Sequence, residues 1–408
     1  MHEIHRPGSL RQTRPRTEGW VQRVDADGRP LLEFGEPKHG QPPIHLADLT
    51  LPERVEAMGR MGLPGFRAKQ LSTHLFGRME TEAEEMTDLP ASDRSRIVAG
   101  LLPPLLTEVR RLRADDGMTI KFLWRLFDGA LIESVLMRYP GRITLCVSSE
   151  AGCGMNCPFC ATGRNGLTRN LSTAEIVEQV IEANRAIRAG ELGAGGGRVT
   201  NVVFMGMGEP MANYKRVLAA VHRMIDPVPE GLGMSARHLT MSTVGLVPAI
   251  RKLTAEGLQM RLALSLHAPD DELRDEMIPV NRHWKVDQAL DAAHAYFEAT
   301  GRRVSIEYAL IRDMNDHPWR ADLLAQKLNA RGHGWAHVNP IPLNPIPGSV
   351  WTASTEAATA EFLNRLREAG IAATLRDTRG KDIDGACGQL AAADALGSAA
   401  SGAQAASR

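Results

Sequence analysis

The sequence predicts a parallel α/β fold, either a partial barrel or a doubly wound sheet. Two observations support this prediction. From Ile143 onward, six apolar strand-like runs alternate with six amphipathic helical runs. Before them, an Asp128-Gly129 pair separates two further apolar runs, which is the pattern of a β-hairpin. We therefore expect a parallel sheet that is covered by helices and extended at its N-terminal side by a hairpin.

The chain before the hairpin predicts a tail and a helical unit. Residues 1–45 form a basic stretch rich in Arg, Pro and Gly, and we expect solvated disorder there rather than RNA contact. Residues 46–115 show helical periodicity, with Leu63-Pro64-Gly65 between two amphipathic segments and Phe66 opening the second. This pattern indicates a small helical accessory domain of the helix–turn–helix type. The core domain would then span residues 116–390 and include the hairpin.

The hairpin carries an unusual carboxylate. Its two apolar runs are Thr119–Phe127 and Leu131–Met137, and Glu133 shares strand parity with the apolar Leu131 and Val135. A carboxylate on an apolar face is unfavourable unless it is paired, neutral or functional. The residues alone leave two interpretations open. An ion pair with a nearby arginine is favoured at this point, and a general base in a dry site is the alternative.

The six strand–helix units come next. The strands are expected near Ile143–Ser149, Asn201–Met207, His238–Val244, Met260–His267, Val304–Ile311 and His337–Pro342. The helices are expected at Thr173–Arg188, Asn213–Ile225, Val247–Glu256, Val286–Thr300, Trp319–Arg331 and Glu356–Ala369. Ser172 and Glu175 form a capping box for the first of these helices. In a barrel and in a doubly wound sheet alike, ligands collect at the carboxyl ends of the strands.

Three cysteines form a C-x3-C-x2-C motif after the first of these strands: Cys153, Cys157 and Cys160. Thiolates hold iron–sulfur clusters, and a [4Fe–4S] cluster bound by three cysteines keeps one iron open for another ligand. Zinc would require a fourth ligand such as histidine at short spacing, and none follows in the loop. Only two other cysteines exist in the chain, which disfavours chance clustering. We rank a redox cluster above zinc, and zinc above coincidence.

Polar residues also follow the later strands. The second strand ends in Met205–Pro210, whose glycines allow a ligand close to the backbone and whose Glu209 could hold an ammonium group. The third, fourth and sixth strands deliver Ser242, Ser265-Leu266-His267 and Asn344 to the same edge. Each of these residues alone is more typical of a loop cap than of a ligand. Together they predict a polar pocket for a small molecule.

Two cysteines lie outside the motif. Cys146 shares a strand face with Thr144 and Ser148, so we expect its thiol to point to the polar side of the strand. Cys387 lies in Asp384–Gln389, where flanking glycines favour a mobile loop. A buried, inert thiol is the ordinary state of a free cysteine, but a loop of this composition favours an exposed and reactive one.

Composition is that of a globular protein, with 43% hydrophobic and 24% charged residues and zero formal net charge. The sequence has no apolar run near the roughly 18 residues of a membrane span, and no signal-peptide pattern. Five cysteines, three of them clustered, suit a reducing compartment. We therefore expect a cytoplasmic protein without a membrane partner. Because the net charge is zero, any surface that binds nucleic acid must be a local basic patch.

Two further stretches have compositional interpretations. A basic patch follows the helical unit, and its members are Arg110, Arg111, Arg113, Lys121 and Arg125. A solvated face is the favoured account of this patch, and RNA contact is the alternative. Residues 391–408 are rich in Ala and Ser and are expected to form a disordered tail.

The cysteine motif, with the aromatic Phe159 just before its last cysteine, resembles the radical S-adenosylmethionine (SAM) superfamily. More narrowly, the chain from about residue 46 to Leu390 resembles the RlmN-type dual-specificity RNA methyltransferases. Besides the cysteine motif, the segments that carry this resemblance are Leu145–Ser149, Met205–Pro210, Ser265–His267, Asn344–Gly348 and Asp382–Leu390. The resemblance implies a radical-SAM partial (β/α)6 barrel with a small N-terminal helical accessory domain and a β-hairpin extension.

The resemblance also implies a role for each candidate residue. Cys153, Cys157 and Cys160 would ligate one [4Fe–4S] cluster. Two molecules of SAM per turnover would be bound by Gly208, Glu209, Ser242, Ser265, Leu266, His267 and Asn344. Cys387 would carry the methyl group as S-methylcysteine, and Cys146 would be the resolving thiol that forms a transient disulfide with it. Glu133 would be the proton acceptor, an interpretation that now outweighs the ion pair.

The implied reaction is radical methylation of adenine C2 in 23S rRNA and in tRNA beside the anticodon. The implied partners are these RNAs and an unidentified reductant such as flavodoxin or ferredoxin, and we expect a monomer. Three alternatives stay open: a Cfr-type enzyme that methylates adenine C8, a non-catalytic zinc-containing RNA-binding protein, and another radical enzyme such as a glycyl-radical activase. Glu209-Pro210, Pro345–Gly348 and Thr378–Gly380 fit the C2 enzymes better than the C8 enzymes.

Overall fold

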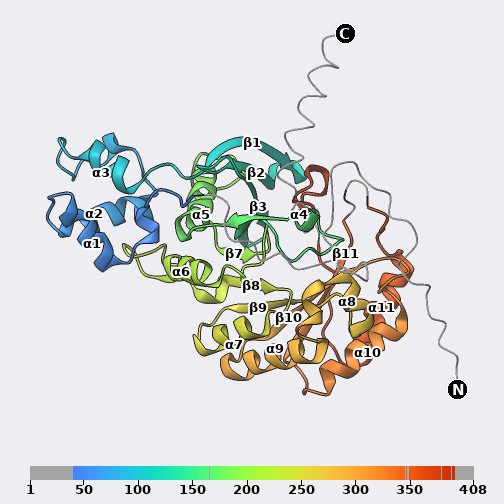
Figure 1. Cartoon of the computed structure of the whole chain (residues 1–408). Coiled ribbons are helices and arrows are strands. Elements are labelled where there is room, and N and C mark those ends of the chain that lie inside the picture. The colour runs from blue at the N-terminus through green and yellow to red at the C-terminus, as the bar shows by residue number, and fades with distance from the viewer. Residues whose placement is uncertain are drawn as a thin grey trace, which may run out of the picture.

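The structure is a computed structural model that describes residues 40–164, 166–344, 346, 349–377, 379–386 and 388–390. Within these residues, one nine-stranded sheet has the strand order β1-β2-β3-β4-β7-β8-β9-β10-β11 (Figure 1). The first strands are β1 (Thr107–Ala114), β2 (Thr119–Arg125), β3 (Leu131–Tyr139) and β4 (Arg142–Cys146). These four pair antiparallel, and from β4 onward each neighbouring pair is parallel.

The parallel half contains the six predicted strand–helix units. After β4, its strands are β7 (Asn201–Phe204), β8 (Leu239–Thr243), β9 (Arg261–Ser265), β10 (Val304–Leu310) and β11 (Ala336–Pro342). The helices that follow the six strands are α5 (Thr173–Arg188), α6 (Tyr214–Ile225), α7 (Val247–Ala255), α9 (Val286–Thr300), α10 (Pro318–Asn329) and α11 (Glu356–Glu368). The predicted strand–helix order is therefore confirmed, and the open row of six parallel strands favours the partial barrel.

Figure 1 shows these helices outside the curved sheet, which leaves the inner face to the loops. The chain after α11 covers the free edge of β11: Val338 N donates to Ala372 O at 2.9 Å, and Arg376 N donates to Pro340 O at 2.8 Å. The segment that ends at Leu390 then reaches the cysteine loop, where Ala161 N donates to Gly388 O at 2.8 Å. The C-terminal segment therefore lies across the open side of the barrel.

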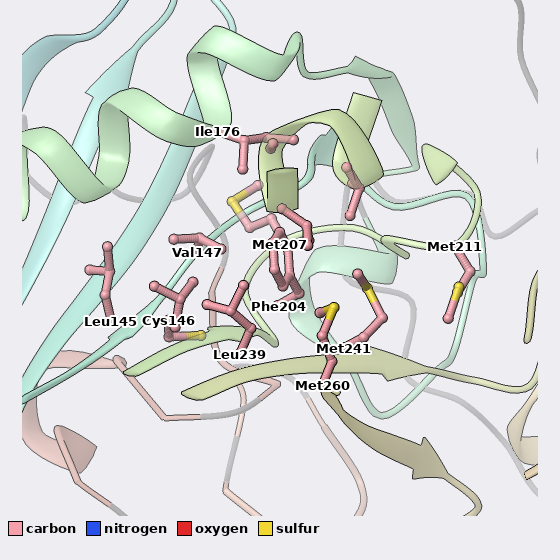
Figure 2. Packing of buried hydrophobic residues seen from close by; sticks show 14 of the residues in the cluster. Leu145, Cys146, Val147, Ile176, Phe204, Met207, Met211, Leu239, Met241 and Met260 are labelled. Atoms are coloured by element: carbon pink, nitrogen blue, oxygen red, sulfur yellow. The ribbon is translucent and has the colours of Figure 1, made fainter. Parts of the chain in front are cut away.

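The core forms because successive side chains of each strand point to opposite faces. Ile176 of α5 packs in one cluster with Val147, Phe204 and Met207, all of them at most 3% exposed (Figure 2). The predicted capping box starts this helix: Glu175 N donates to Ser172 Oγ at 3.1 Å, and Ser172 N donates to Glu175 Oε2 at 2.9 Å. These contacts fix the first helix against the strands that deliver the site.

The N-terminal helices are α1 (Leu51–Arg60), α2 (Phe66–Ser72) and α3 (Arg94–Leu101). They lie beside α5 and α6 (Figure 1), and the chain leading into them is anchored there, because Ala174 N donates to Asp48 Oδ1 at 2.8 Å. The prediction of helix up to residue 115 was wrong, because β1 begins at Thr107. Val109 and Leu112 have helical spacing, but hydrogen bonding to β2 fixes this segment as a strand.

The predicted tails lie almost wholly outside the described residues, which begin at residue 40 and end at residue 390. The first predicted tail was too long, because His45 is 1% exposed and belongs to the packed structure. Among the short elements that were not predicted are the ribbon of β5 (Glu150–Gly152) and β6 (Leu167–Asn170), and helices α4 (Ala161–Arg164) and α8 (Asp271–Met277). Among the described helices, none is both long and apolar enough to cross a membrane.

Candidate active site

A cavity of about 1100 Å³, counted with the part that is open to solvent, lies at the carboxyl ends of the parallel strands. The three cysteines of the motif line it, together with six of the seven predicted SAM-binding residues: Gly208, Glu209, Ser242, Ser265, His267 and Asn344. These residues come from the ends of five different strands or the loops after them. The parallel topology thus brings to one edge the groups that the sequence scatters over about 190 residues.

The cysteine loop is held between β5 and β6. Cys153 N donates to Gly166 O at 2.8 Å, which closes the base of the loop. Gly152 has a φ of +78°, and a Cβ there would lie 2.0 Å from Gly166 O, so glycine is required at this crossing. Gly163 of α4 (Ala161–Arg164) approaches the Cys157 backbone so closely that a Cβ would lie 3.1 Å from Cys157 N. The loop is therefore compact, and its three thiols face one cavity.

The thiols of the motif are buried beside one another and beside a carboxyl group. Burial raises the pKa of Cys153 well above its usual range, and nearby Glu150 and Cys160 raise it further. Burial and Cys160 likewise raise the pKa of Cys157. The thiols would thus hold their protons unless a cation joins them, and iron supplies that charge. Within the described residues, no three His, Cys, Asp or Glu side chains converge on a single ion. The three thiols of a [4Fe–4S] site do not need to converge on one ion, because each thiolate binds a different iron of the cluster.

The glycine-rich loop after β7 is anchored to the start of the cysteine loop. Met207 N donates to Ser148 Oγ at 2.9 Å, and Glu209 N donates to Glu150 Oε2 at 2.9 Å. Gly208 has a φ of +98°, and a Cβ there would lie 2.5 Å from Glu150 Cβ. The two loops therefore pack without space for side chains between them, which keeps backbone groups at the cavity wall.

Glu209 is more enclosed than the sequence suggested. It is 3% exposed, and its carboxylate accepts the backbone N–H groups of Met211 at 3.0 Å and Val244 at 2.9 Å. Burial raises its pKa to about 7, against the opposing effect of these hydrogen bonds. Binding of an ammonium group by Glu209 stays a prediction, and such a cation would stabilise the ionised carboxylate.

Replacing Gly206 by alanine is expected to destabilise the protein by about 1–3 kcal/mol. A Cβ at this position would lie 2.6 Å from Val147 O and 2.8 Å from Ser148 N, both rigid backbone atoms. Urea unfolding of the cluster-free protein measures the effect. Gly59→Ala on α1 is the matched control, because no atom lies within 4 Å of its added Cβ. Equal midpoints for the two variants would show that the loops do not pack this closely.

The remaining predicted SAM residues differ in position. Ser242 Oγ and Ser265 Oγ lie 3.4 Å apart on the wall of the cavity, within reach of one shared hydroxyl or amino group. Asn344 is 5% exposed and lies on the same wall. Leu266 does not line the cavity: its side chain is fully buried in the core, and its N–H donates to Glu307 O at 3.0 Å. A direct contact between Leu266 and SAM stays a prediction that this geometry does not favour.

His267 is a neutral, fixed residue of the cavity wall. Its Nδ1 accepts the N–H of Ala309 at 2.9 Å, and the ring packs edge-on against Phe159, with centroids 5.1 Å apart. The aromatic residue before the last cysteine thus connects the cysteine loop to β9. Burial, with a smaller effect of Arg274, lowers the pKa of His267 from 6.5 to about 3.

Acid is therefore expected to destabilise the cluster-free protein through His267. The pKa of His267 is 6.5 in the unfolded chain and about 3 in the folded chain. Between these two pH values, only the unfolded chain carries a proton on this residue. The contribution of His267 to the free energy of unfolding is therefore complete above pH 6.5. It decreases by about 1 kcal/mol per pH unit as the pH falls toward the folded-state pKa. In His267→Asn, whose amide oxygen can replace Nδ1 as acceptor, urea unfolding between about pH 7 and 5 should show a smaller slope. An unchanged slope would contradict this account.

Cys146 lines a second cavity that adjoins the first. Both walls include Met205, Ile341, Asn344, Arg376 and Leu390, so the two spaces share a boundary. Cys146 is 7% exposed and packs at the edge of the core, and it lines this second cavity together with charged residues such as Asp377 and Arg379. Cys387 lies outside the described residues. Its described neighbours are Ala386, which lines the second cavity, and Gly388, which lines the first.

Glu133 is buried and ion-paired. Its side chain is 1% exposed, and Oε1 lies 3.1 Å from Lys121 Nζ. The ion-pair interpretation was correct in kind, but its partner is a lysine and not the expected arginine. The assignment of Lys121 to a solvated basic patch was wrong, because its side chain is only 8% exposed. The cross-strand pairing of Leu123 with Glu133 puts Lys121 on the same face of the hairpin as Glu133.

Two charged residues of the cavity were not predicted from the sequence. Glu307 of β10 accepts Ser305 Oγ at 2.6 Å and Asn339 Nδ2 at 2.8 Å. Arg376 lies 3.4 Å from the same carboxylate and lines both cavities. A signal for Glu307 was present, because Ser305 and Glu307 alternate with apolar residues in a strand of the barrel. Nothing in the sequence around Arg376 indicated that it would reach this site.

Comparisons with known proteins agree with this geometry. The model of the Radical SAM superfamily matches residues 147–324. A relative from Kocuria rhizophila, named "Probable dual-specificity RNA methyltransferase RlmN", is 65% identical over 88% of this chain and 95% of its own length. A relative of the same name from Thermobifida fusca is 63% identical over 89% of this chain and 99% of its own.

A solved structure is also similar. A radical SAM methyltransferase from Sphaerobacter thermophilus aligns with a TM-score of 0.81 and 44% identity, over 86% of this chain and 100% of that chain. Membership of the superfamily implies a [4Fe–4S] cluster and SAM, and the three thiols around one cavity fit that cluster. On the strength of nearly full-length relatives and a cavity of the expected composition, the chain belongs to the RlmN family of radical SAM RNA methyltransferases.

Proposed function

We propose that this enzyme methylates C2 of adenine in 23S rRNA and in tRNA beside the anticodon, with Cys387 as the methyl carrier. The observation that supports this most strongly is the pair of adjoining cavities. One is lined by the three motif cysteines, and the other is lined by Cys146. The described residues on either side of Cys387 each line one of the two cavities. The Cys387 thiol must react first with SAM and then with the RNA base. A position between the cofactor cavity and a second, adjoining cavity would allow both reactions.

A methyl carrier is needed because of the target carbon. Adenine C2 lies between two ring nitrogens and is electron-poor, so it does not attack the methyl group of SAM. A thiolate does, and we assign that first displacement to Cys387. Ser242, Ser265 and Asn344 would hold SAM against the cavity wall during this step, since their polar groups face the space beside the cysteine loop.

A second SAM would supply the radical. Cys153, Cys157 and Cys160 would hold the cluster, whose chemistry would be one-electron transfer: the reductive cleavage of SAM to methionine and a 5′-deoxyadenosyl radical, and the later acceptance of one electron from the adduct. The radical removes a hydrogen atom from the S-methyl group of Cys387, and the resulting carbon radical adds to C2. Much of the cavity wall around these residues is apolar, which would limit the contact of such a reactive group with water.

Two residues would complete the reaction. After the adduct has returned one electron, Glu133 accepts the C2 proton. Lys121 favours the ionised form of this buried carboxylate, which is the form that a proton acceptor requires. The Cys146 thiolate then attacks the Cys387 sulfur, so that an S–S bond forms as the S–CH2 bond breaks. The released carbon takes a proton and becomes the methyl group. An external thiol must reduce the disulfide, and a reductant such as flavodoxin or ferredoxin must reduce the cluster.

Product analysis tests this proposal. The enzyme is incubated anaerobically with SAM and a reductant, and unmodified rRNA and tRNA are supplied in separate reactions. Nucleosides from digested RNA are then compared by mass spectrometry with 2-methyladenosine and 8-methyladenosine standards. We expect 2-methyladenosine from both RNAs. Formation of 8-methyladenosine alone would overturn the C2 assignment, and product from only one RNA would overturn dual specificity.

A further inference from the structure

Lys121 connects two parts of the molecule that are far apart in sequence. It lies on β2, and its side chain is 8% exposed. Its ammonium group is 3.1 Å from Glu133 Oε1 on β3, and it donates to the carbonyl of Asp384 at 3.2 Å. Asp384 lies three residues before Cys387 in the chain. One buried cation therefore contacts both the proposed proton acceptor and the segment that leads to the proposed methyl carrier.

The turn between β1 and β2 holds that segment at a second point. Gly380 N donates to Asp115 Oδ2 at 3.1 Å, and Thr119 Oγ1 donates to the same oxygen at 2.5 Å. Asp115 and Lys121 thus fix the two ends of the turn from Gly380 to Asp384. Asp115 lies in the turn between β1 and β2 and Lys121 lies on β2, so both anchors come from the antiparallel strands that extend the barrel.

Because both side chains are buried, the charges of Lys121 and Glu133 stabilise each other. An ammonium group and a carboxylate each lose most of their hydration when buried, and each is tolerated because the other is near. Without Lys121, the ionised form of the buried Glu133, which is the form that can accept a proton, would lose the stabilisation of this neighbouring cation. Without the contact to Asp384, the turn would lose one of its two anchors on the hairpin.

We propose that Lys121 is a positioning residue for the second half of the reaction, which keeps Glu133 ionised and holds the 380–384 turn against the hairpin. This inference rests on the proposed function, because it assumes that Glu133 accepts the C2 proton and that Cys387 carries the methyl group. It predicts which step of the reaction is impaired when Lys121 is replaced. Methyl transfer from SAM to Cys387 does not use Glu133, whereas release of the RNA from the enzyme does.

The test compares Lys121→Gln with Lys121→Arg in the full chain with its cluster reconstituted. Glutamine keeps a hydrogen-bond donor but removes the charge, and arginine keeps the charge. For Lys121→Gln we expect cluster absorbance and S-methylation of Cys387 to persist, release of methylated RNA to fall about 100-fold or more, and covalent protein–RNA adduct to accumulate. Lys121→Arg should recover release to within about tenfold of the wild type.

A surface lysine supplies the matched control. Lys327 is also ion-paired, with Asp287 at 2.7 Å, but on the outer helices. Lys327→Met should leave RNA release within about twofold of the wild type. A second readout needs no cluster: hydrogen exchange in peptides that cover residues 379–390 of the cluster-free protein should be faster in Lys121→Gln than in the wild type or Lys327→Met.

The outcomes separate the inference from the proposed function. Absence of 2-methyladenosine from the wild-type reaction overturns the proposed function. A productive wild type together with a Lys121→Gln variant that releases RNA normally, without adduct, overturns the inference. Equal loss of cluster, S-methylation and RNA release in Lys121→Gln and Lys121→Arg also overturns it, because that pattern indicates a purely structural role.

Discussion

Replacement of Cys157 by alanine is expected to leave the purified enzyme without cluster absorbance in the visible range and without detectable RNA methylation. Cys157 lies in a compact loop whose three thiols face one cavity, so removal of one thiolate leaves a cluster with two protein ligands. Every later step depends on the radical. The measurement is the visible spectrum and iron content after anaerobic reconstitution, followed by nucleoside analysis of treated RNA.

Cys146→Ala is the matched control for that experiment. It also replaces a buried cysteine, but one on the wall of the second cavity. It should keep the brown colour and the iron of the wild type. A wild-type protein that is colourless and binds zinc in place of iron would contradict the cluster assignment, and would favour a structural zinc in an RNA-binding protein.

Cys146→Ala is itself expected to convert the enzyme into one that traps its RNA. The variant can still methylate Cys387 and generate the radical, but nothing can attack the Cys387 sulfur and release the product. The protein should therefore remain joined to the RNA through a thioether. Denaturing gels should show a band that disappears on treatment with either protease or ribonuclease, and free methylated RNA should fall by about 1000-fold or more.

The double replacement of Cys146 and Cys387 by alanine is the control for trapping. It keeps the cluster loop intact but has no methyl carrier, so no adduct should form. An adduct of the same mass in the double variant would show that another residue attaches to the RNA. Normal turnover by Cys146→Ala would show that product release does not use this thiol.

Strand parity and chain order are enough to predict which residues reach the carboxyl edge of the sheet. Strand alternation grouped Cys146 with Thr144 and Ser148 on the polar side of β4, and in the structure Cys146 lines the second cavity. The capping residues Ser172 and Glu175 fixed the start of α5. Parallel strands then bring their carboxyl ends together, so Ser242, Ser265 and Asn344 had to meet.

Other features depend on the register between strands, which local patterns do not specify. β1 has apolar residues at helical spacing, and only pairing with β2 makes it a strand. Lys121 appeared to belong to a basic surface because four arginines lie near it in sequence. The hairpin register pairs Lys121 with Val135 and Leu123 with Glu133, so Lys121 lies diagonally across from Glu133 on the same face and forms an ion pair with it. Leu266 lies between two cavity residues, but alternation turns its side chain into the core.

Several predictions are untouched by the fold and the comparisons. The boundary of the core domain at residue 390, the monomeric state and the reductant stay predictions. The residue roles assigned to Cys387, Cys146 and Glu133 are proposals that the variants above address. The family and the fold class, by contrast, follow from nearly full-length relatives and from the row of six parallel strands.

The carrier mechanism is tested most directly by following deuterium from SAM whose methyl group carries three deuterium atoms. The wild-type enzyme is first cleared of existing S-methyl groups and then allowed to turn over with this SAM and unmodified RNA. Removal of one deuterium by the radical predicts 2-methyladenosine with two deuterium atoms in its methyl group, and one deuterium in the released 5′-deoxyadenosine. A product that keeps all three deuterium atoms, with none in 5′-deoxyadenosine, would contradict the account.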